Sequence, residues 1–250
     1  MGFLKRFLHN VFREEASPAI GSSFEHLSEE ELESHLEIRQ YGDFRLSDAV
    51  RPSFDLQIVP QQGFRHDVYL DDDAHREVPV LMASLSQERI FEVFMEMLDP
   101  LGDVVDVVLE TSHQKHGTGH EDLYRERMDL PVLKSMLWDY EELLTHDGFT
   151  GLAVLNPHTP QEVQLDEHKL LIVYADQLEA FENVLKRNSV RCNEKIKFIT
   201  EAEHVHSSHE DFLKQFEELK MRLGMDESDD WDWPMPEEDA DFYDGYEGAF

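Results

Sequence analysis

The segment Val104–Leu109 constrains the fold more than any other part of this chain. Four valines and one leucine occupy six positions there, and only Asp106 interrupts them. A run that is apolar at both odd and even positions is typical of a central strand covered on both faces. The chain must therefore place other strands beside this segment and helices over it.

Shorter patterns on either side of this run supply those elements. Apolar residues with strand periodicity predict further strands at 54–58, 78–85, 152–155, 163–165 and 170–174. A spacing of three and four predicts helices at 28–42, 86–100, 131–148, 176–185 and 207–224. Ser28 and Glu31 form a capping box for the first of these, Pro131 suits the start of the third, and residues 111–129 are expected to form a loop.

The order of these elements mixes a strand–helix–strand unit at 78–110 with hairpins. It predicts an α+β or α/β fold with a single mixed sheet of about five to seven strands, partly covered by helices. Four regions are expected. They are a flexible basic amphipathic helix at 1–13, a linker and polar surface helix at 14–49, a globular domain at 50–224 and a disordered acidic-aromatic tail at 225–250.

Charge is distributed unevenly along the chain. The formal net charge is -33, and residues 226–250 contain eleven acidic residues and no Lys or Arg, whereas residues 1–13 contain three basic residues and no acid. Direct nucleic-acid binding is disfavoured, because neutralising phosphates requires clustered Lys and Arg.

Other compositional signals point to the cytoplasm. The single Cys192 cannot form an intramolecular disulfide, so nothing indicates an oxidising compartment. No window has the roughly 20 apolar residues of a transmembrane helix, and the N-terminus lacks the features of a secretory signal. We therefore expect a cytoplasmic protein without a transmembrane segment, which can lie peripherally at a membrane through its first helix.

Histidines provide the main signal for a chemical site. Two groups occur, each followed by acidic residues, at His113, His116 and His120 and at His204, His206 and His209. Neutral imidazole binds zinc, copper, nickel and iron, so the two groups can share a divalent transition metal if they meet in space. The alternative, which we favour on sequence alone, is that these are surface loop histidines and that no cofactor is bound.

Two further residues allow a chemical reading and a structural one. Asp106 within the apolar run is either a buried acid–base group or a carboxylate that faces solvent or a helix terminus, and the second reading is favoured because burying an unpaired acid is unfavourable. Cys192 is either an activated thiolate or an incidental cysteine, and the latter is favoured. No phosphate-binding, dinucleotide-binding or nucleophile-elbow motif occurs.

The two ends of the chain carry the candidate partner-binding residues. The first helix has a basic side and an apolar row formed by Phe3, Leu4, Phe7, Leu8, Val11 and Phe12. The tail places aromatic residues between acids, including Trp231, Trp233, Phe242 and Tyr243. Such segments dock on apolar or oppositely charged surfaces.

These observations favour a non-enzymatic, cytoplasmic protein-interaction or regulatory protein that binds through its two ends. The expected partners are a protein with a basic or apolar groove and, peripherally, an anionic membrane surface. Two alternatives remain: a metal-dependent enzyme that uses the two histidine groups, and an acidic, immunity-like inhibitor of a basic protein.

Overall fold

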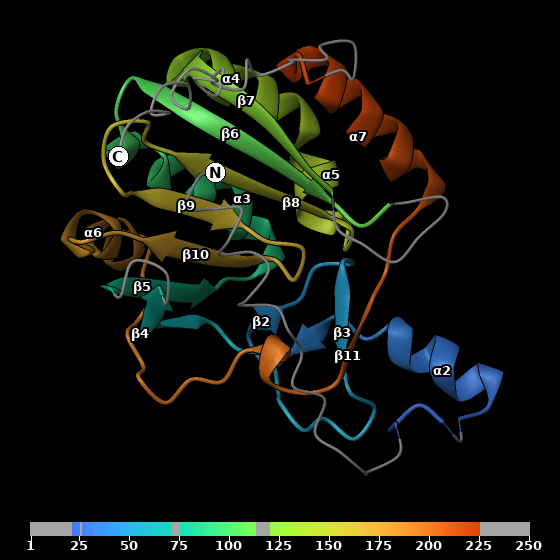
Figure 1. Ribbon diagram of the computed structural model, residues 1–250. Helices are drawn as coiled ribbons and strands as arrows, with labels where there is room; N and C mark the ends of the chain where they lie inside the picture. The colour runs from blue at the N-terminus through green and yellow to red at the C-terminus, as the bar shows by residue number, and fades with distance from the viewer. Residues whose placement is uncertain (1–21, 26, 72–75, 114–120, 226–250) are drawn as a thin grey trace, which may run out of the picture.

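The computed structural model describes residues 22–25, 27–71, 76–113 and 121–225. The predicted N-terminal helix and residues 226–250 of the predicted tail lie outside the described residues, as do His116 and His120. The described part is an α+β fold built on one large sheet (Figure 1).

The large sheet has seven strands in the order β4-β5-β10-β9-β8-β6-β7. The strands are β4 (Gly63–Asp71), β5 (Arg76–Ser84), β6 (Val104–Thr111), β7 (Glu121–Asp129), β8 (Thr150–Leu155), β9 (Glu162–Leu165) and β10 (Leu170–Tyr174). All six neighbouring pairs are antiparallel. The predicted strand number is confirmed, but the prediction of a mixed sheet is wrong.

Hairpins account for the antiparallel order. They join β4 to β5, β6 to β7, β8 to β9 and β9 to β10. The predicted strand–helix–strand unit is β5, α3 (Gln87–Met97) and β6. Its two strands run in the same direction, but β10, β9 and β8 lie between them, so no parallel ladder forms.

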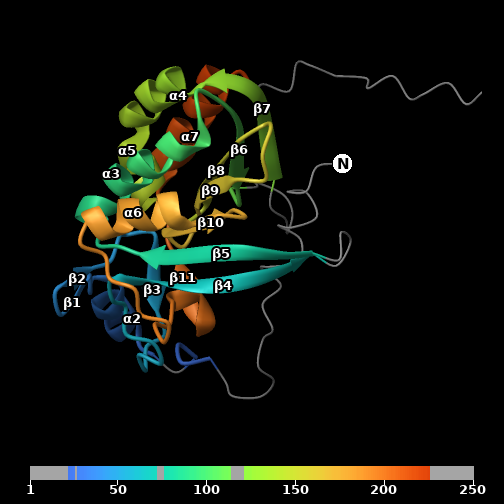
Figure 2. The same ribbon diagram turned by 90° about the vertical axis from the view of Figure 1, so that its left-hand side faces the viewer.

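Helices cover one face of this sheet (Figure 2). Besides α3, they are α4 (Leu130–Leu137), α5 (Glu141–His146), α6 (Glu179–Arg187) and α7 (Glu210–Leu223), with short 3-10 turns at Asp99–Leu101, Trp138–Tyr140 and Ile199–Glu201. All five helices and the inward side chains of the sheet share one core cluster, which includes Phe64, Phe94 and Phe181. On the opposite face, Ile196 and Phe198 pack on β5 and β10. Burial of these apolar side chains is the dominant force that holds the layers together.

A smaller part of the fold lies beside one end of the large sheet (Figures 1 and 2). It contains α2 (Glu29–Leu36), a hairpin of β1 (Gln40–Tyr41) and β2 (Phe44–Arg45), and β3 (Val50–Pro52) paired with β11 (His204–His206). The predicted capping box at the start of α2 is present, because Ser28 Oγ accepts from Glu31 N and Ser28 N donates to Glu31 Oε2.

Three local predictions are wrong. The helix predicted at 28–42 ends at Leu36, because residues 40–45 form the hairpin of β1 and β2 around Gly42, whose φ is 60°. The alternating segment Phe54–Ile58 forms turns and bends rather than a strand, and Phe54 and Leu56 are exposed. The predicted loop at 111–129 contains β7, whose side chains are mostly exposed or half-buried because it is an edge strand. Edge strands carry weaker hydrophobic signals than central strands, which explains the omission.

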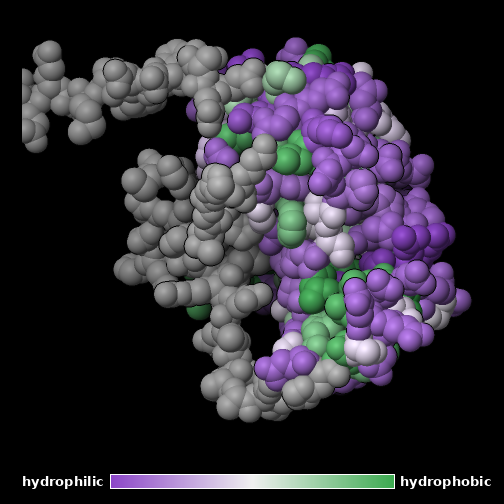
Figure 3. All heavy atoms as spheres, turned by 90° about the vertical axis from the view of Figure 1, so that its right-hand side faces the viewer, coloured by the Kyte–Doolittle hydropathy of each residue, from purple (hydrophilic) through white to green (hydrophobic). Residues whose placement is uncertain are grey.

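The surface is polar over wide areas. Figure 3 shows that the described residues facing the viewer are mainly hydrophilic, with smaller hydrophobic areas between them. Among the described residues, no helix has the length and apolar character needed to cross a bilayer.

Candidate metal centre

Strand β11 places two of the predicted histidines on one side of the chain. His204 and His206 are two residues apart, so their side chains project from the same face of the strand. Their ring centroids are 5.2 Å apart. Antiparallel pairing with β3, in which His204 faces Pro52 and His206 faces Val50, holds this strand in register.

A third histidine, His168, joins them from the turn between β9 and β10. Asp166 organises this turn, because its Oδ1 accepts a hydrogen bond from Leu170 N at 2.7 Å and its backbone oxygen accepts from Lys169 N at 3.0 Å. Lys169 takes the left-handed conformation, with φ of 60°. The result is a tight turn that presents His168, only 7% exposed, to β11.

The three imidazoles converge. Ring centroids of His168 lie 4.9 Å from His204 and 4.7 Å from His206. One potential ligand atom from each ring lies within 4.8 Å of the other two. Nitrogen ligands in a tetrahedral zinc site lie roughly 3.4 Å apart, given metal–nitrogen distances of about 2.0–2.1 Å. The ligand atoms lie at most 4.8 Å apart, so binding one ion requires the rings to move closer together.

Each of the three rings makes a hydrogen bond through Nδ1 to an oxygen atom. The acceptors are Asp166 Oδ2 at 2.9 Å for His168, Ala202 O at 2.8 Å for His204 and Gly148 O at 2.7 Å for His206. An oxygen acceptor requires the proton on Nδ1, which leaves Nε2 as the ligand atom in the neutral tautomer. Metal-binding histidines characteristically have such outer partners, which fix the tautomer and the ring orientation. The three residues therefore fit a transition metal.

The charges around the rings favour a cation. Burial and the neighbouring Lys169 lower the pKa of His168, but the charge and hydrogen bond of Asp166 together with the charge of Glu167 outweigh them, so this pKa is raised. Burial and the nearby His168 lower the pKa of His206. Glu167 also acts on both rings, and its Oε2 accepts a hydrogen bond from Ser112 Oγ at 2.9 Å.

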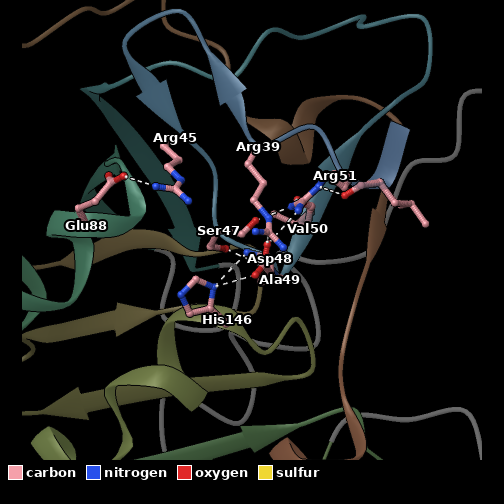
Figure 4. A network of polar contacts seen from close by, with 10 residues as sticks. Arg39, Arg45, Ser47, Asp48, Ala49, Val50, Arg51, Glu88 and His146 are labelled. Atoms are coloured by element: carbon pink, nitrogen blue, oxygen red, sulfur yellow. Dashed lines mark hydrogen bonds and ion pairs between the residues drawn. The ribbon is translucent and has the colours of Figure 1, made fainter. Parts of the chain in front are cut away.

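A polar network anchors β3, and through it β11 (Figure 4). The Arg51 guanidinium is buried and donates to the backbone oxygens of Leu36 at 2.8 Å and Val50 at 2.8 Å, and to Asp48 Oδ1 at 3.0 Å. Asp48 N in turn donates to His146 Nδ1 at 3.2 Å. The network thus links the small sheet to α2 and to the end of α5.

Gly148 allows the close approach on which His206 depends. A Cβ atom there would lie 2.2 Å from Ala49 O and 2.8 Å from Ser207 O. Gly148 N donates to Ser207 O at 2.9 Å, and Gly148 O is the acceptor for His206. A side chain at this position would push β3 and the segment after β11 away from the site.

The other predicted histidines occupy different positions. His113 Nε2 pairs with Asp147 Oδ2 at 2.6 Å, and its ring contacts Phe149, which stacks on His206 with centroids 6.5 Å apart. His209 is exposed and caps α7, since its Nδ1 accepts from Asp211 N at 3.4 Å. The ring of Phe149 therefore lies between His113 of the first predicted group and His206 of the second. The converging set consists of His168, His204 and His206 and does not include His113.

Asp147 has a structural role behind His113. Its carboxylate is fully buried and accepts a hydrogen bond from Thr150 Oγ1 at 2.5 Å. Burial opposes ionisation, but hydrogen bonds from His113, Ser208 and Thr150 more than offset it, so the pKa of Asp147 is lowered.

The remaining sequence candidates have local partners. Asp106 is half-buried at a β-bulge, where its Oδ1 accepts from Arg127 N at 2.8 Å. Cys192 is exposed and contacts Glu194. The candidate partner-binding residues at 3–12 and 231–243 lie outside the described residues. Comparisons of the chain with protein-family models, curated proteins and solved structures found no match.

Proposed function

We propose that this protein binds a divalent transition metal ion, zinc in the first place, through His168, His204 and His206. The observation that carries the proposal is the convergence of three imidazoles whose Nδ1 atoms all have oxygen partners. Imidazole ligands suit zinc, copper, nickel and iron but not magnesium or calcium, which prefer oxygen.

Three protein ligands leave a coordination position for water or a substrate oxygen. This arrangement characterises zinc sites that hydrolyse substrates, where the ion activates its bound water. His204 and His206 are half-buried rather than fully enclosed, so solvent can reach this side of the site. The proposal keeps the metal-dependent alternative predicted from the sequence. It retains His204 and His206 as ligands and uses His168 in place of the other predicted histidines. Binding of protein or membrane partners through the chain ends, and the cytoplasmic location, stay predictions.

Zinc titration of the protein after chelator treatment tests the proposal. A chromogenic competitor measures the number of bound equivalents and their affinity for wild type and for the double variant His204→Gln/His206→Gln. We expect the double variant to bind one equivalent fewer. His158→Gln is the matched control, because His158 is exposed on the loop between β8 and β9.

Circular dichroism of the metal-free proteins separates loss of ligands from loss of fold. A folded double variant that binds zinc with the same stoichiometry and affinity as wild type would refute the proposal. His168→Gln provides an independent check, since it removes the ligand that comes from the large sheet.

A further inference from the structure

A short segment after α6 runs beside the edge strand β4. Phe64 N donates to Arg191 O at 3.1 Å, and Asn193 N donates to Phe64 O at 2.8 Å, around a parallel bridge between Phe64 and Cys192. Two residues further along both segments, this register brings Glu194 beside His66. The position is fixed by a hydrogen bond of 3.0 Å from His66 N to Glu194 Oε2.

Three side chains of different chemistry meet at this edge. Glu194 Oε1 lies 2.7 Å from His66 Nδ1 and accepts from Cys192 Sγ at 3.0 Å. One potential ligand atom from each of the three residues lies within 4.8 Å of the others. All three residues are exposed, so a cation can reach them from solvent.

A fourth residue, Glu182 on α6, completes the arrangement behind His66. Its Oε1 lies 3.1 Å from His66 Nε2, while its Oε2 accepts from Lys186 Nζ at 2.5 Å. When Nδ1 of a histidine binds a metal, its proton moves to Nε2, where a carboxylate acceptor orients the ring and increases its basicity. Glu182 already occupies that place.

We propose that His66, Cys192 and Glu194 form a second metal site, separate from the three-histidine site, which takes a thiophilic divalent ion such as zinc, cobalt or cadmium. Without a metal, His66 Nδ1 and Cys192 Sγ both lie within hydrogen-bond distance of Glu194 Oε1. In the proposed site the ion replaces the hydrogen atoms in these two contacts. Thiolate, imidazole and carboxylate together are ligands of the zinc class rather than of magnesium or calcium.

Charge and protons balance in this exchange. Binding breaks the S–H bond of Cys192 and forms a metal–sulfur bond, and the released proton goes to solvent. A neutral His66 keeps its proton by moving it to Nε2, whereas a charged His66 releases a second one. The thiolate and the Glu194 carboxylate then neutralise the two positive charges of the ion.

Cobalt titration of the metal-free full-length protein under reducing conditions tests the proposal, because cobalt–thiolate bonding gives a near-ultraviolet charge-transfer band. We expect this band in wild type and its absence in Cys192→Ser. The double variant His204→Gln/His206→Gln lacks the three-histidine site, so its band should persist and saturate at one equivalent. Failure of the three-histidine site and failure of this site are therefore distinguishable.

Three further variants separate a built site from adventitious binding to one thiol. His66→Gln and Glu194→Gln should lower the cobalt affinity, measured from the charge-transfer band, by at least tenfold. Glu182→Gln should lower it by roughly 10–100-fold, because Glu182 is the hydrogen-bond partner of a ligand. Glu179→Gln, also on α6 and exposed, should have no effect. Absence of the band in folded wild type, or an unchanged affinity in both His66→Gln and Glu194→Gln, would overturn the proposal.

Discussion

Replacement of Glu162 by glutamine should change how the stability of this protein depends on pH. Glu162 lies on β9 and is 3% exposed, and its Oε1 accepts a hydrogen bond from Gln164 Nε2. Burial raises the pKa of Glu162 from an ordinary value of 4.5 to about 8, although the bond from Gln164 acts in the opposite direction. The folded protein therefore favours the neutral acid.

The sign of the effect follows from linkage. A folded-state pKa above the unfolded one means that the contribution of Glu162 to stability is fully present below pH 4.5 and is lost as pH rises through about 8. Each pKa unit corresponds to about 1.4 kcal/mol, so the full difference sets an upper bound of about 5 kcal/mol, of which about 4 kcal/mol is reached at pH 8. We expect Glu162→Gln to be about 2–4 kcal/mol more stable than wild type at pH 8, and within about 1 kcal/mol of it at pH 5.

Urea unfolding at a series of pH values between 5 and 8.5, with chelator present, measures this difference directly. Glutamine keeps an oxygen that can accept from Gln164, so the hydrogen bond is not the variable. Glu179→Gln is the control for the general effect of removing one negative charge from an acidic chain, because Glu179 is exposed. A difference between Glu162→Gln and wild type that stays constant across this pH range would refute the reasoning.

Three other perturbations have defined outcomes. Gly148→Ala should destabilise the protein by about 1–3 kcal/mol through overpacking against Ala49 O, and should weaken zinc binding at His206, as measured by urea unfolding and zinc titration. Zinc at about 100 times its dissociation constant should add about 2.7 kcal/mol to the free energy of unfolding. For a chain of this size this corresponds to a rise of roughly 5–10 °C in melting temperature. His206→Gln should abolish the part of this rise that the three-histidine site supplies. A chain ending at Met225, whose side chain packs in the core, should unfold within about 0.5 kcal/mol of the full chain, and a larger loss would show that residues 226–250 contribute to the fold.

Much of the fold could be predicted because its signals are local. The Ser28 and Glu31 capping box and the early Pro131 of α4 each depend on residues within one helical turn. The apolar run of β6 identified a strand of the large sheet, with Val105, Val107 and Leu109 facing the helices. Strand order could not be predicted in this way, because it depends on which hairpins pair, and three strands separate β5 from β6.

The candidate metal site was only half visible in the sequence, for a physical reason. His204 and His206 belong to a pattern that alternation places on one strand face, but His168 lies 36 positions earlier on a different sheet. The available local signal was Asp166, two residues before His168 in a turn. That carboxylate uses one oxygen to close the turn on Leu170 N and the other to hold His168 Nδ1. One side chain therefore fixes both the backbone that carries the histidine and the direction of its ring. His168 meets His204 and His206 only when β11 is paired with β3 beside this turn. The site therefore depends on tertiary contacts, which short sequence spacings do not contain.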